Sequence, residues 1–558
     1  MAITAQSFGL RASESKASLD PITIEVIGSA LLSVAEEMGK AIIRAAYSTN
    51  IKERQDCSTA LFDEQGRIIA LAEHIPIHLG SLLGITEYVI KRHDHSSFRP
   101  GDVFVGNDAY TGGGTHLNDI VLLEPVFHTG VLTGWVANLA HHSDFVDRGH
   151  AHIFQEGLRI PPVRLYREGV LQDDVMQLIL LNCQVPWERV NDFRAQMAAS
   201  RLGVQRFQAL CDKYGREIVV AAGARILDYT ERRARAGIAK IPTGVYEFRH
   251  AFDTNLIDEI LDLKVRVEVK GGEIFVDFPD APPQVRAPIN MVETALLGTV
   301  YFAVKALIDP EIPANAGLHR VIHVTAPVGS VLNATPPAAV YSRTDIAQRL
   351  VDMIFAAFSK SIPECVAAAS TGGTLLTVSG MHPLTGRFYV YNEMHGGGMG
   401  ARATKDGLDG VQVNITNTAN LPIEALESEF PVRVECYELL QDSGGAGEYR
   451  GGMTMRRRVR VLDHVATISA GGTSSVMPPF GLSGGLPGCP SRVELSQGAA
   501  PLNRRSGTLQ PDQTVGMVAA SGGGFGDPKK RDRKLVLRDL REERISQRAA
   551  VEIYGLKS

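Results

Sequence analysis

Three side chains in the first third of the chain, His116, Asp119 and His141, could together bind a metal ion. Two imidazoles and a carboxylate suit one divalent first-row ion such as Zn, Mn or Fe, because both are borderline-to-hard ligands and no thiolate is nearby. The alternative is that they are ordinary polar residues at the open end of a β-hairpin. Spacing alone leaves both interpretations open, because a set of three nitrogen and oxygen ligands is less specific than paired CxxC motifs.

The residues between these side chains predict the hairpin that would position them. Two β-rich apolar runs between residues 120 and 139 flank a short turn. If the hairpin folds symmetrically about Thr129, the residues before the first run face the end of the second run at about 5 Å. His116 and Asp119 would then lie beside His141.

A second polar cluster is predicted upstream. Two apolar runs after Asp56 indicate another hairpin, which turns at the sequence DEQG beginning at residue 63. Folding it sets Asp56 near Glu73 and His74, with His78 a few residues further along. These residues either form a hydrogen-bonded structural cluster or contribute to the same site.

The composition is that of an ordinary globular protein of several domains. The chain has 558 residues, 44% of them hydrophobic and 21% charged, which predicts two to four domains. A net charge of −5 gives no reason to expect nucleic acid or an anionic membrane as a partner. Neither a transmembrane span nor a signal peptide is evident, and the six cysteines have no framework spacing, so we expect a cytoplasmic location.

The order of patterns along the chain predicts an α+β, multi-domain fold that is rich in β-hairpins and has a long helical segment in the middle. We divide it into a flexible leader (1–20), a metal-site domain made of an N-terminal helix and hairpins (21–165), a helical segment (166–240), a mixed α/β region with glycine-rich turns (241–528) and a charged tail (529–558).

The 55 glycines are unusual in number and occur in discrete runs, for example at 112, 396, 443 and 522. The run at 112 would permit the turn that His116 and Asp119 need in order to converge. The later runs predict tight turns, or loops whose N–H groups approach a phosphoryl group. The sequence has no Walker motif, and GLSGG at 481 lacks the strand-to-helix context of a serine nucleophile, so neither an ATP site of its own nor a serine hydrolase is expected.

Several segments together are similar to one known family. They include ERQDCS at 53, AEHIPIHLGS at 72, GNDAYTGGGTHLNDI at 106, NLAHHSDFVD at 138, NEMHGGGMGARATKDG at 392 and DSGGAGEYRGG at 442. With them, nearly the whole chain resembles the B-type subunit of the hydantoinase, oxoprolinase and acetone-carboxylase family.

The resemblance implies a subunit that carries one divalent metal ion and works with an A-type subunit of actin-like ATPase fold, which binds the ATP. The complex would be an A2B2-like heterotetramer acting on a small molecule. The family's metal ligands match His116, Asp119 and His141, and an aspartate matches Asp56.

Four further residues are candidates for proton transfer or substrate contact, although each could equally be a structural hydrogen-bonding group: His142, Asp144, His74 and His78. The chain departs from many relatives at YSRTDIAQRL, residues 341–350, where Arg343 and Asp345 change the local charge. Because of that departure, the substrate of the relatives does not transfer directly to this chain.

Three functions follow from the resemblance. The favoured one is an ATP-dependent hydrolase of cyclic amides, because the chain is shorter than expected for a carboxylase subunit. The second is an ATP-dependent carboxylase of acetone or acetophenone type. The third is a non-catalytic scaffold for the partner ATPase.

Overall fold

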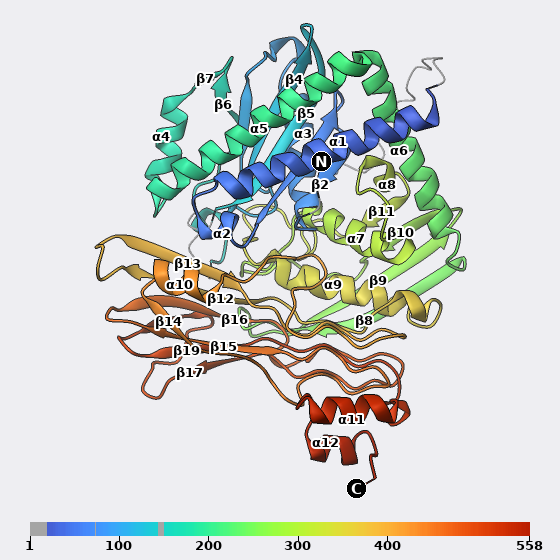
Figure 1. Ribbon diagram of the computed structural model, residues 1–558, viewed down its shortest axis with the longest axis vertical. Helices are drawn as coiled ribbons and strands as arrows, with labels where there is room; N and C mark the ends of the chain where they lie inside the picture. Colours follow the sequence, from blue (N-terminus) through green and yellow to red (C-terminus); the bar gives the residue numbers. More distant parts are fainter. Residues whose placement is uncertain (1–18, 73, 143–149, 558) are drawn as a thin grey trace.

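The computed structural model describes residues 19–72, 74–142 and 150–557. It confirms the predicted α+β class: helices and several separate sheets are combined in one chain (Figure 1). The predicted leader lies almost entirely outside the described residues, as does Asp144. Within the described residues, no helix is both long enough and apolar enough to cross a membrane.

A seven-stranded sheet organises the N-terminal half, with strand order β2-β1-β5-β4-β3-β6-β7. Its strands are β1 (Cys57–Asp63), β2 (Ile68–Ala72), β3 (Val103–Gly106), β4 (Asp119–His128), β5 (Val131–His141), β6 (Val163–Arg167) and β7 (Val170–Leu171). The two predicted hairpins are its centre, because β5 pairs with both β4 and β1.

Helices cover both faces of this sheet. One face packs on α1 (Pro21–Ala45) and α5 (Pro186–Tyr214), and the other packs on α3 (His78–Arg92). Successive side chains of a strand point to opposite faces, so Leu61 joins the α1 side whereas Ala60 and Phe62 join the α3 side. The same alternation sends the side chains of neighbouring residues at the end of β5 to different layers.

The register of the central hairpin differs slightly from the prediction. The turn has two residues, Thr129 and Gly130, both with positive φ (49° and 80°), as in the tight turns that suit twisted strands. A bulge beside Val126 adds a further shift. As a result Asp119 pairs directly with His141, instead of lying one or two positions beyond it.

The predicted helical segment begins later than residue 166. Residues 163–171 form the β6–β7 hairpin, and the helices start with α4 (Asp173–Leu181), followed by α5 and α6 (Arg216–Ile238). The short helix α2 (Thr49–Lys52) connects α1 to the strand that carries the first polar cluster. The long helices pack along the sheet and against α1 and therefore brace the hairpins.

A four-stranded sheet of order β11-β10-β9-β8 joins the two halves of the molecule (Figure 1). It contains β8 (Gly244–Phe252), β9 (Leu261–Lys270), β10 (Glu273–Asp277) and β11 (Ile322–Thr325), and it packs with α7 (Glu293–Ile308), α8 (Ala316–His319) and α9 (Arg343–Ala357). The N-terminal end of helix α9, at Arg343, faces the large sheet's histidines.

The C-terminal half is a sandwich of two antiparallel sheets, ordered β13-β12-β16-β18 and β14-β15-β19-β17. The first contains β12 (Thr374–Met381), β13 (Phe388–Met394), β16 (Ala466–Gly472) and β18 (Ser506–Leu509). The second contains β14 (Val432–Leu439), β15 (Met455–Val461), β17 (Arg492–Leu495) and β19 (Thr514–Val518), and α10 (Ile423–Glu429) precedes it. Apolar side chains of both sheets share one core.

The charged tail forms two helices, α11 (Arg533–Arg541) and α12 (Gln547–Glu552), at the end of the molecule next to the sandwich (Figure 1). They bury a small apolar cluster together with Ala446 and are anchored by Arg531, which pairs with Asp406 and Asp539. The tail is therefore a docked element.

The glycine runs after residue 390 were predicted to be tight turns or loops that approach a phosphoryl group, and the tight-turn prediction is wrong for most of them. Most of these glycines have ordinary negative φ and lie where extended segments touch backbone to backbone. A Cβ on Gly398 would be 1.9 Å from the carbonyl oxygen of Gly452, and one on Gly522 would be 2.0 Å from that of Met399. Glycine is required here for close approach of the chain segments, not for turning.

Candidate metal centre

Five of the predicted site residues come together on the α3 side of the large sheet. His141 ends β5, and Asp119 begins β4 opposite it. Asp56 immediately precedes β1, where its carbonyl oxygen accepts a hydrogen bond from the backbone N–H of His141 at 3.0 Å. His116 lies in the loop before β4, and His78 is the first residue of α3.

The side chains of these residues are in mutual contact. The Nε2 atom of His116 lies 2.9 Å from Asp119 Oδ1, and the imidazole rings of His116 and His141 are 5.1 Å apart between centroids. The Nε2 atom of His78 lies 3.5 Å from Asp56 Oδ1 and 4.0 Å from Asp119 Oδ1. Asp56 and the three histidines line one cavity of about 60 Å³. The convergence predicted for His116, Asp119 and His141 is therefore present.

The loop before β4 brings His116 and Asp119 together although they are only three residues apart. The backbone N–H of Asp119 donates to the carbonyl of His116 at 3.1 Å, which closes a turn. Gly114 has a φ of 101°, and a Cβ there would lie 2.9 Å from the Cβ of Asp119. This glycine supplies both the left-handed backbone and the space for the aspartate, as the run at 112 led us to expect.

We predict that Gly114→Ala destabilises the fold by about 1–3 kcal/mol and displaces the Asp119 carboxylate, because the new methyl group meets that residue in a strained backbone conformation. Gly130→Ala is the matched control, since Gly130 has a φ of 80° but no atom within 4 Å of an added Cβ. Urea unfolding of both variants, with metal content measured alongside, checks the prediction. Equal losses in the two variants would show that backbone strain alone acts at Gly114.

Hydrogen bonds around Asp119 and His116 fit a cation between them. The Nδ1 atom of His116 lies 3.2 Å from the carbonyl oxygen of Tyr341, so Nδ1 carries the ring proton and Nε2 presents its lone pair to Asp119 Oδ1. The other carboxylate oxygen, Oδ2, accepts from Ser81 at 2.8 Å and from Arg343 at 3.2 Å. A lone pair facing a carboxylate oxygen across 2.9 Å requires a proton or a metal ion to bridge them.

The hydrogen bonds of His141 fit metal binding less well than those of His116. The amide nitrogen of Asn50 lies 3.0 Å from His141 Nδ1 and donates to the carbonyl oxygen of His141 at 2.8 Å, while Asn50 Oδ1 accepts from Arg54. In this arrangement Nδ1 accepts, so Nε2 carries the proton of a neutral ring. Among the described residues, no three His, Cys, Asp or Glu side chains already have the arrangement of a formed metal site. Metal binding through His141 therefore requires a rearrangement at Asn50.

Burial favours neutral imidazoles at this site, beside the ionised carboxylate of Asp119. Desolvation lowers the pKa of His141 to about 3, and it also lowers the pKa of His116, where the charge of Arg343 adds to the effect. Burial alone would raise the pKa of Asp119, but the neighbouring His116 and Arg343 outweigh it and hold that pKa well below its usual value. Neutral imidazole and carboxylate are the protonation states that bind a divalent metal.

Comparison with known proteins places this chain in one family. The family model described as hydantoinase B/oxoprolinase matches residues 20–528. The chain belongs to this family. An uncharacterised protein of Methanocaldococcus jannaschii is 37% identical over 97% of this chain and 96% of its own length. The B subunit of a putative D-/L-hydantoinase from Pseudomonas sp. (strain NS671) is 32% identical over 96% of this chain and 95% of its own length.

Two solved structures match the fold of this chain. The crystal structure of ATP-dependent caprolactamase from Pseudomonas jessenii matches with a TM-score of 0.87 and 28% identity, over 97% of both chains. Acetone carboxylase, in a nucleotide-free structure, matches with a TM-score of 0.88 and 19% identity, over 96% of this chain and 80% of the other. The second match shows a shared fold only.

Two other predicted site residues of this hydantoinase B chain lie outside the cluster. His142 points to the opposite face of the sheet, where its Nε2 lies 3.1 Å from Gln196 Oε1 and its ring packs on Phe193. His74 is half-buried. Its ring lies directly against Gly39 of α1, where an added Cβ would be 2.3 Å from the Nε2 atom of His74. Neither residue lines the cavity. Glu73, predicted to lie beside Asp56, is outside the described residues. His78, predicted in the same cluster, does lie beside Asp56.

Sequence reasoning missed the arginines of the candidate site. Arg343 was noted only as a departure from related sequences, yet its guanidinium contacts both Asp119 and Thr115. Arg54 and Arg505 line the same cavity, and Arg505 pairs with Asp345 at 2.6 Å. The buried salt bridge between Arg343 and Asp119 joins residues 224 positions apart, so it has no local sequence signature and only the fold reveals it.

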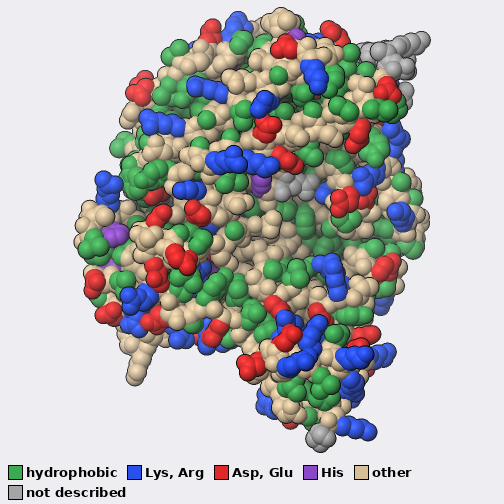
Figure 2. All heavy atoms as spheres, in the orientation of Figure 1, with side chains coloured by type: hydrophobic (Ala, Val, Ile, Leu, Met, Phe, Trp, Pro, Cys, Tyr) green, Lys and Arg blue, Asp and Glu red, His purple; other side chains and the backbone are tan. Residues whose placement is uncertain are grey.

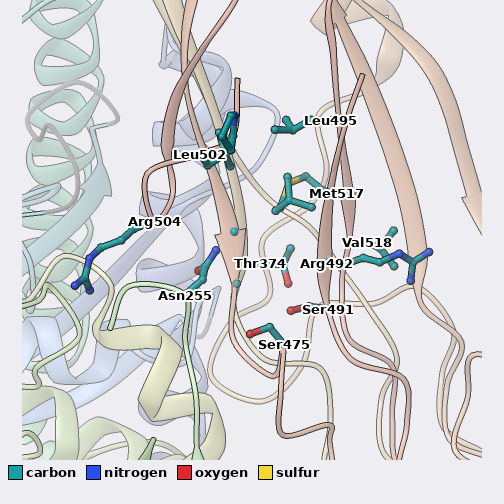
Figure 3. A pocket seen from close by; sticks show the side chains of 14 residues that line it. Asn255, Thr374, Ser475, Ser491, Arg492, Leu495, Leu502, Arg504, Met517 and Val518 are labelled. Atoms are coloured by element: carbon teal, nitrogen blue, oxygen red, sulfur yellow. The ribbon is translucent and has the colours of Figure 1, made fainter. Parts of the chain in front are cut away.

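A larger cavity, of about 300 Å³, lies in the sandwich (Figure 3). Its lining combines Leu495, Leu502 and Met517 with Asn255 and Ser491, and it contains no histidine or carboxylate. On the molecular face in Figure 2, acidic and basic side chains are interspersed, without a large patch of one sign. Of these two cavities, the one beside the histidines combines metal-ligand chemistry with buried charge.

Proposed function

We propose that this chain is the metal-bearing B subunit of an ATP-dependent hydrolase of cyclic amides. The observation that carries the proposal is the buried contact between His116, Asp119 and His141 in a chain whose relatives include a caprolactamase. The caprolactamase matches over 97% of both chains, whereas this chain covers only 80% of the acetone carboxylase chain. That difference favours the hydrolase over the carboxylase.

A ring amide needs activation, because the nitrogen lone pair is delocalised into its carbonyl group. We propose that a partner A-type subunit of actin-like ATPase fold transfers a phosphoryl group from ATP to the amide oxygen. Water then adds to the activated carbon, and the ring C–N bond breaks to give an amine and an acyl phosphate. A second water hydrolyses the acyl phosphate to the ring-opened acid and free phosphate. We expect a partner subunit, because the relatives include proteins named as subunits. We further propose that the complex is A2B2-like and cytoplasmic.

Within this chain, His116 and Asp119 would hold the divalent ion, with His141 and Asp56 completing the set. When bound, Zn, Mn or Fe would supply Lewis-acid polarisation and make water more acidic near neutral pH. Arg343 and Ser81 orient the Asp119 carboxylate through its second oxygen. His78, 3.5 Å from Asp56, is positioned to accept or return a proton.

The alternatives remain an ATP-dependent carboxylase, which the acetone carboxylase fold supports, and a non-catalytic scaffold. The test is co-expression with the neighbouring A-type subunit, followed by metal analysis and an ATP-turnover screen over hydantoins, 5-oxoproline, lactams and ketones, each with and without bicarbonate. Turnover with a cyclic amide that is independent of bicarbonate supports the hydrolase. Turnover only with a ketone and bicarbonate would replace it with the carboxylase.

A further inference from the structure

Three arginines line the cavity of the candidate metal centre: Arg54, Arg343 and Arg505. Two of them are paired with carboxylates. Arg343 lies 3.2 Å from Asp119, and Arg505 lies 2.6 Å from Asp345. Their positive charges are balanced within the protein, so they need no ligand.

Arg54 differs from the other two. Its side chain is 3% exposed, and one terminal nitrogen donates to Asn50 Oδ1 at 2.6 Å and to the carbonyl oxygen of Asn392. Its Nε atom is buried and has no hydrogen-bond partner. Within residues 19–72, 74–142 and 150–557, no carboxylate forms a salt bridge with it.

Burying the Arg54 guanidinium in this way costs folding free energy unless a further group pairs with it. A guanidinium stays protonated at any pH at which the protein folds, so Arg54 cannot lower the cost by losing its proton. Burying an unpaired charge and an unused N–H group each costs free energy. The oxygens of Asn50 and Asn392 accept hydrogen bonds but are neutral and supply no negative charge. Asp56 lines the same cavity and the charge of Arg54 also acts on Glu393, but within the described residues neither carboxylate forms a salt bridge with Arg54, so its guanidinium has no direct anionic partner.

We infer that Arg54, which lines the cavity of about 60 Å³ that the histidines also line, binds an oxyanion of the substrate there. A guanidinium edge matches a carboxylate or a phosphoryl group through paired N–H donors. This inference rests on the proposed function, which offers two sources of that group: a carboxylate on the ring, as in 5-oxoproline, or the phosphoryl group placed on the amide oxygen. The cavity suits a small group of this kind.

The test measures binding to the complete chain by titration calorimetry, without ATP or a partner subunit. The probes are sodium phosphate, sodium 5-oxoprolinate and uncharged 2-pyrrolidinone. Arg54→Met is expected to weaken binding of the anions by at least about 10-fold and to leave 2-pyrrolidinone unchanged, whereas Arg54→Lys retains part of the anion affinity. Arg504→Met is the matched control, because Arg504 lines the other cavity and is 49% exposed.

The two anions distinguish the source. Loss confined to phosphate assigns Arg54 to the phosphoryl group, loss confined to 5-oxoprolinate assigns it to a ring carboxylate, and loss of both assigns it to either oxyanion. Anion binding by Arg54→Met equal to that of the unchanged chain, or no anion binding by the unchanged chain, would overturn the inference. Thermal unfolding and metal content of each variant are measured in parallel, and Arg54→Lys provides a folded comparison if Arg54→Met is unstable. Failure of the amide hydrolase proposal would appear in the turnover screen, not in these titrations.

Discussion

The assembled enzyme with His116→Ala is expected to lose at least about 100-fold in kcat/KM and to retain little metal. The ring nitrogen of His116 lies 2.9 Å from the Asp119 carboxylate, and its tautomer is set by the carbonyl group of Tyr341. Removing it takes away a ligand and also the group that aligns Asp119. Metal analysis of the purified complex and turnover of the best amide from the substrate screen measure the two losses.

His128→Ala is the matched control for this variant. His128 lies at the opposite end of the same hairpin, where its Nε2 contacts Asp212 at the surface. It should keep both metal and activity. A complex with His116→Ala that retained full activity would reject the metal-centred proposal and favour the scaffold alternative. If metal were retained but activity lost, the residue would act in the chemistry without holding the ion.

The hairpin part of the site was predictable because it depends on local rules. Alternating apolar runs and a short turn specify which residues face each other, and that reasoning placed Asp119 close to His141. The error of one or two positions arose from the turn, since a two-residue turn at Thr129 and Gly130 and a bulge at Val126 have no unambiguous signature in one sequence.

Other parts of the site depend on packing between distant segments. His141 and His142 are adjacent in sequence, yet one faces the cavity and the other faces α5, because a strand alternates and only the layers around it decide which face becomes the site. Arg54, Arg343 and Arg505 come from three regions of the chain and meet where α9, the large sheet and the sandwich converge. Likewise, the late glycines were read as turns because sequence alone does not reveal two backbones in contact.

Arg457→Met should destabilise the sandwich by about 3–5 kcal/mol at pH 8, because it leaves the carboxylate of Glu393 buried without its cation. Both side chains are fully buried, with 2.7 Å between Arg457 Nη1 and Glu393 Oε2. Arg456→Met is the matched control. Arg456 is the preceding residue of β15, but its pair with Glu438 is partly exposed, so its loss should cost less than about 1 kcal/mol.

The pH dependence separates lost charge from lost packing. Burial alone would raise the pKa of Glu393, but the charge of Arg457 outweighs burial, so the pKa lies below its usual value. The ionised carboxylate therefore stabilises the folded state at pH values above the pKa that Glu393 has in the unfolded chain. Without Arg457, burial dominates and the folded-state pKa rises above the unfolded one, so the destabilisation should shrink as the pH falls and Glu393 takes up a proton. Adding Glu393→Gln to Arg457→Met should likewise recover part of the loss at pH 8. Urea unfolding between pH 5 and 8 measures both effects, and a loss independent of pH would mean that packing of the arginine, rather than its charge, stabilises this core.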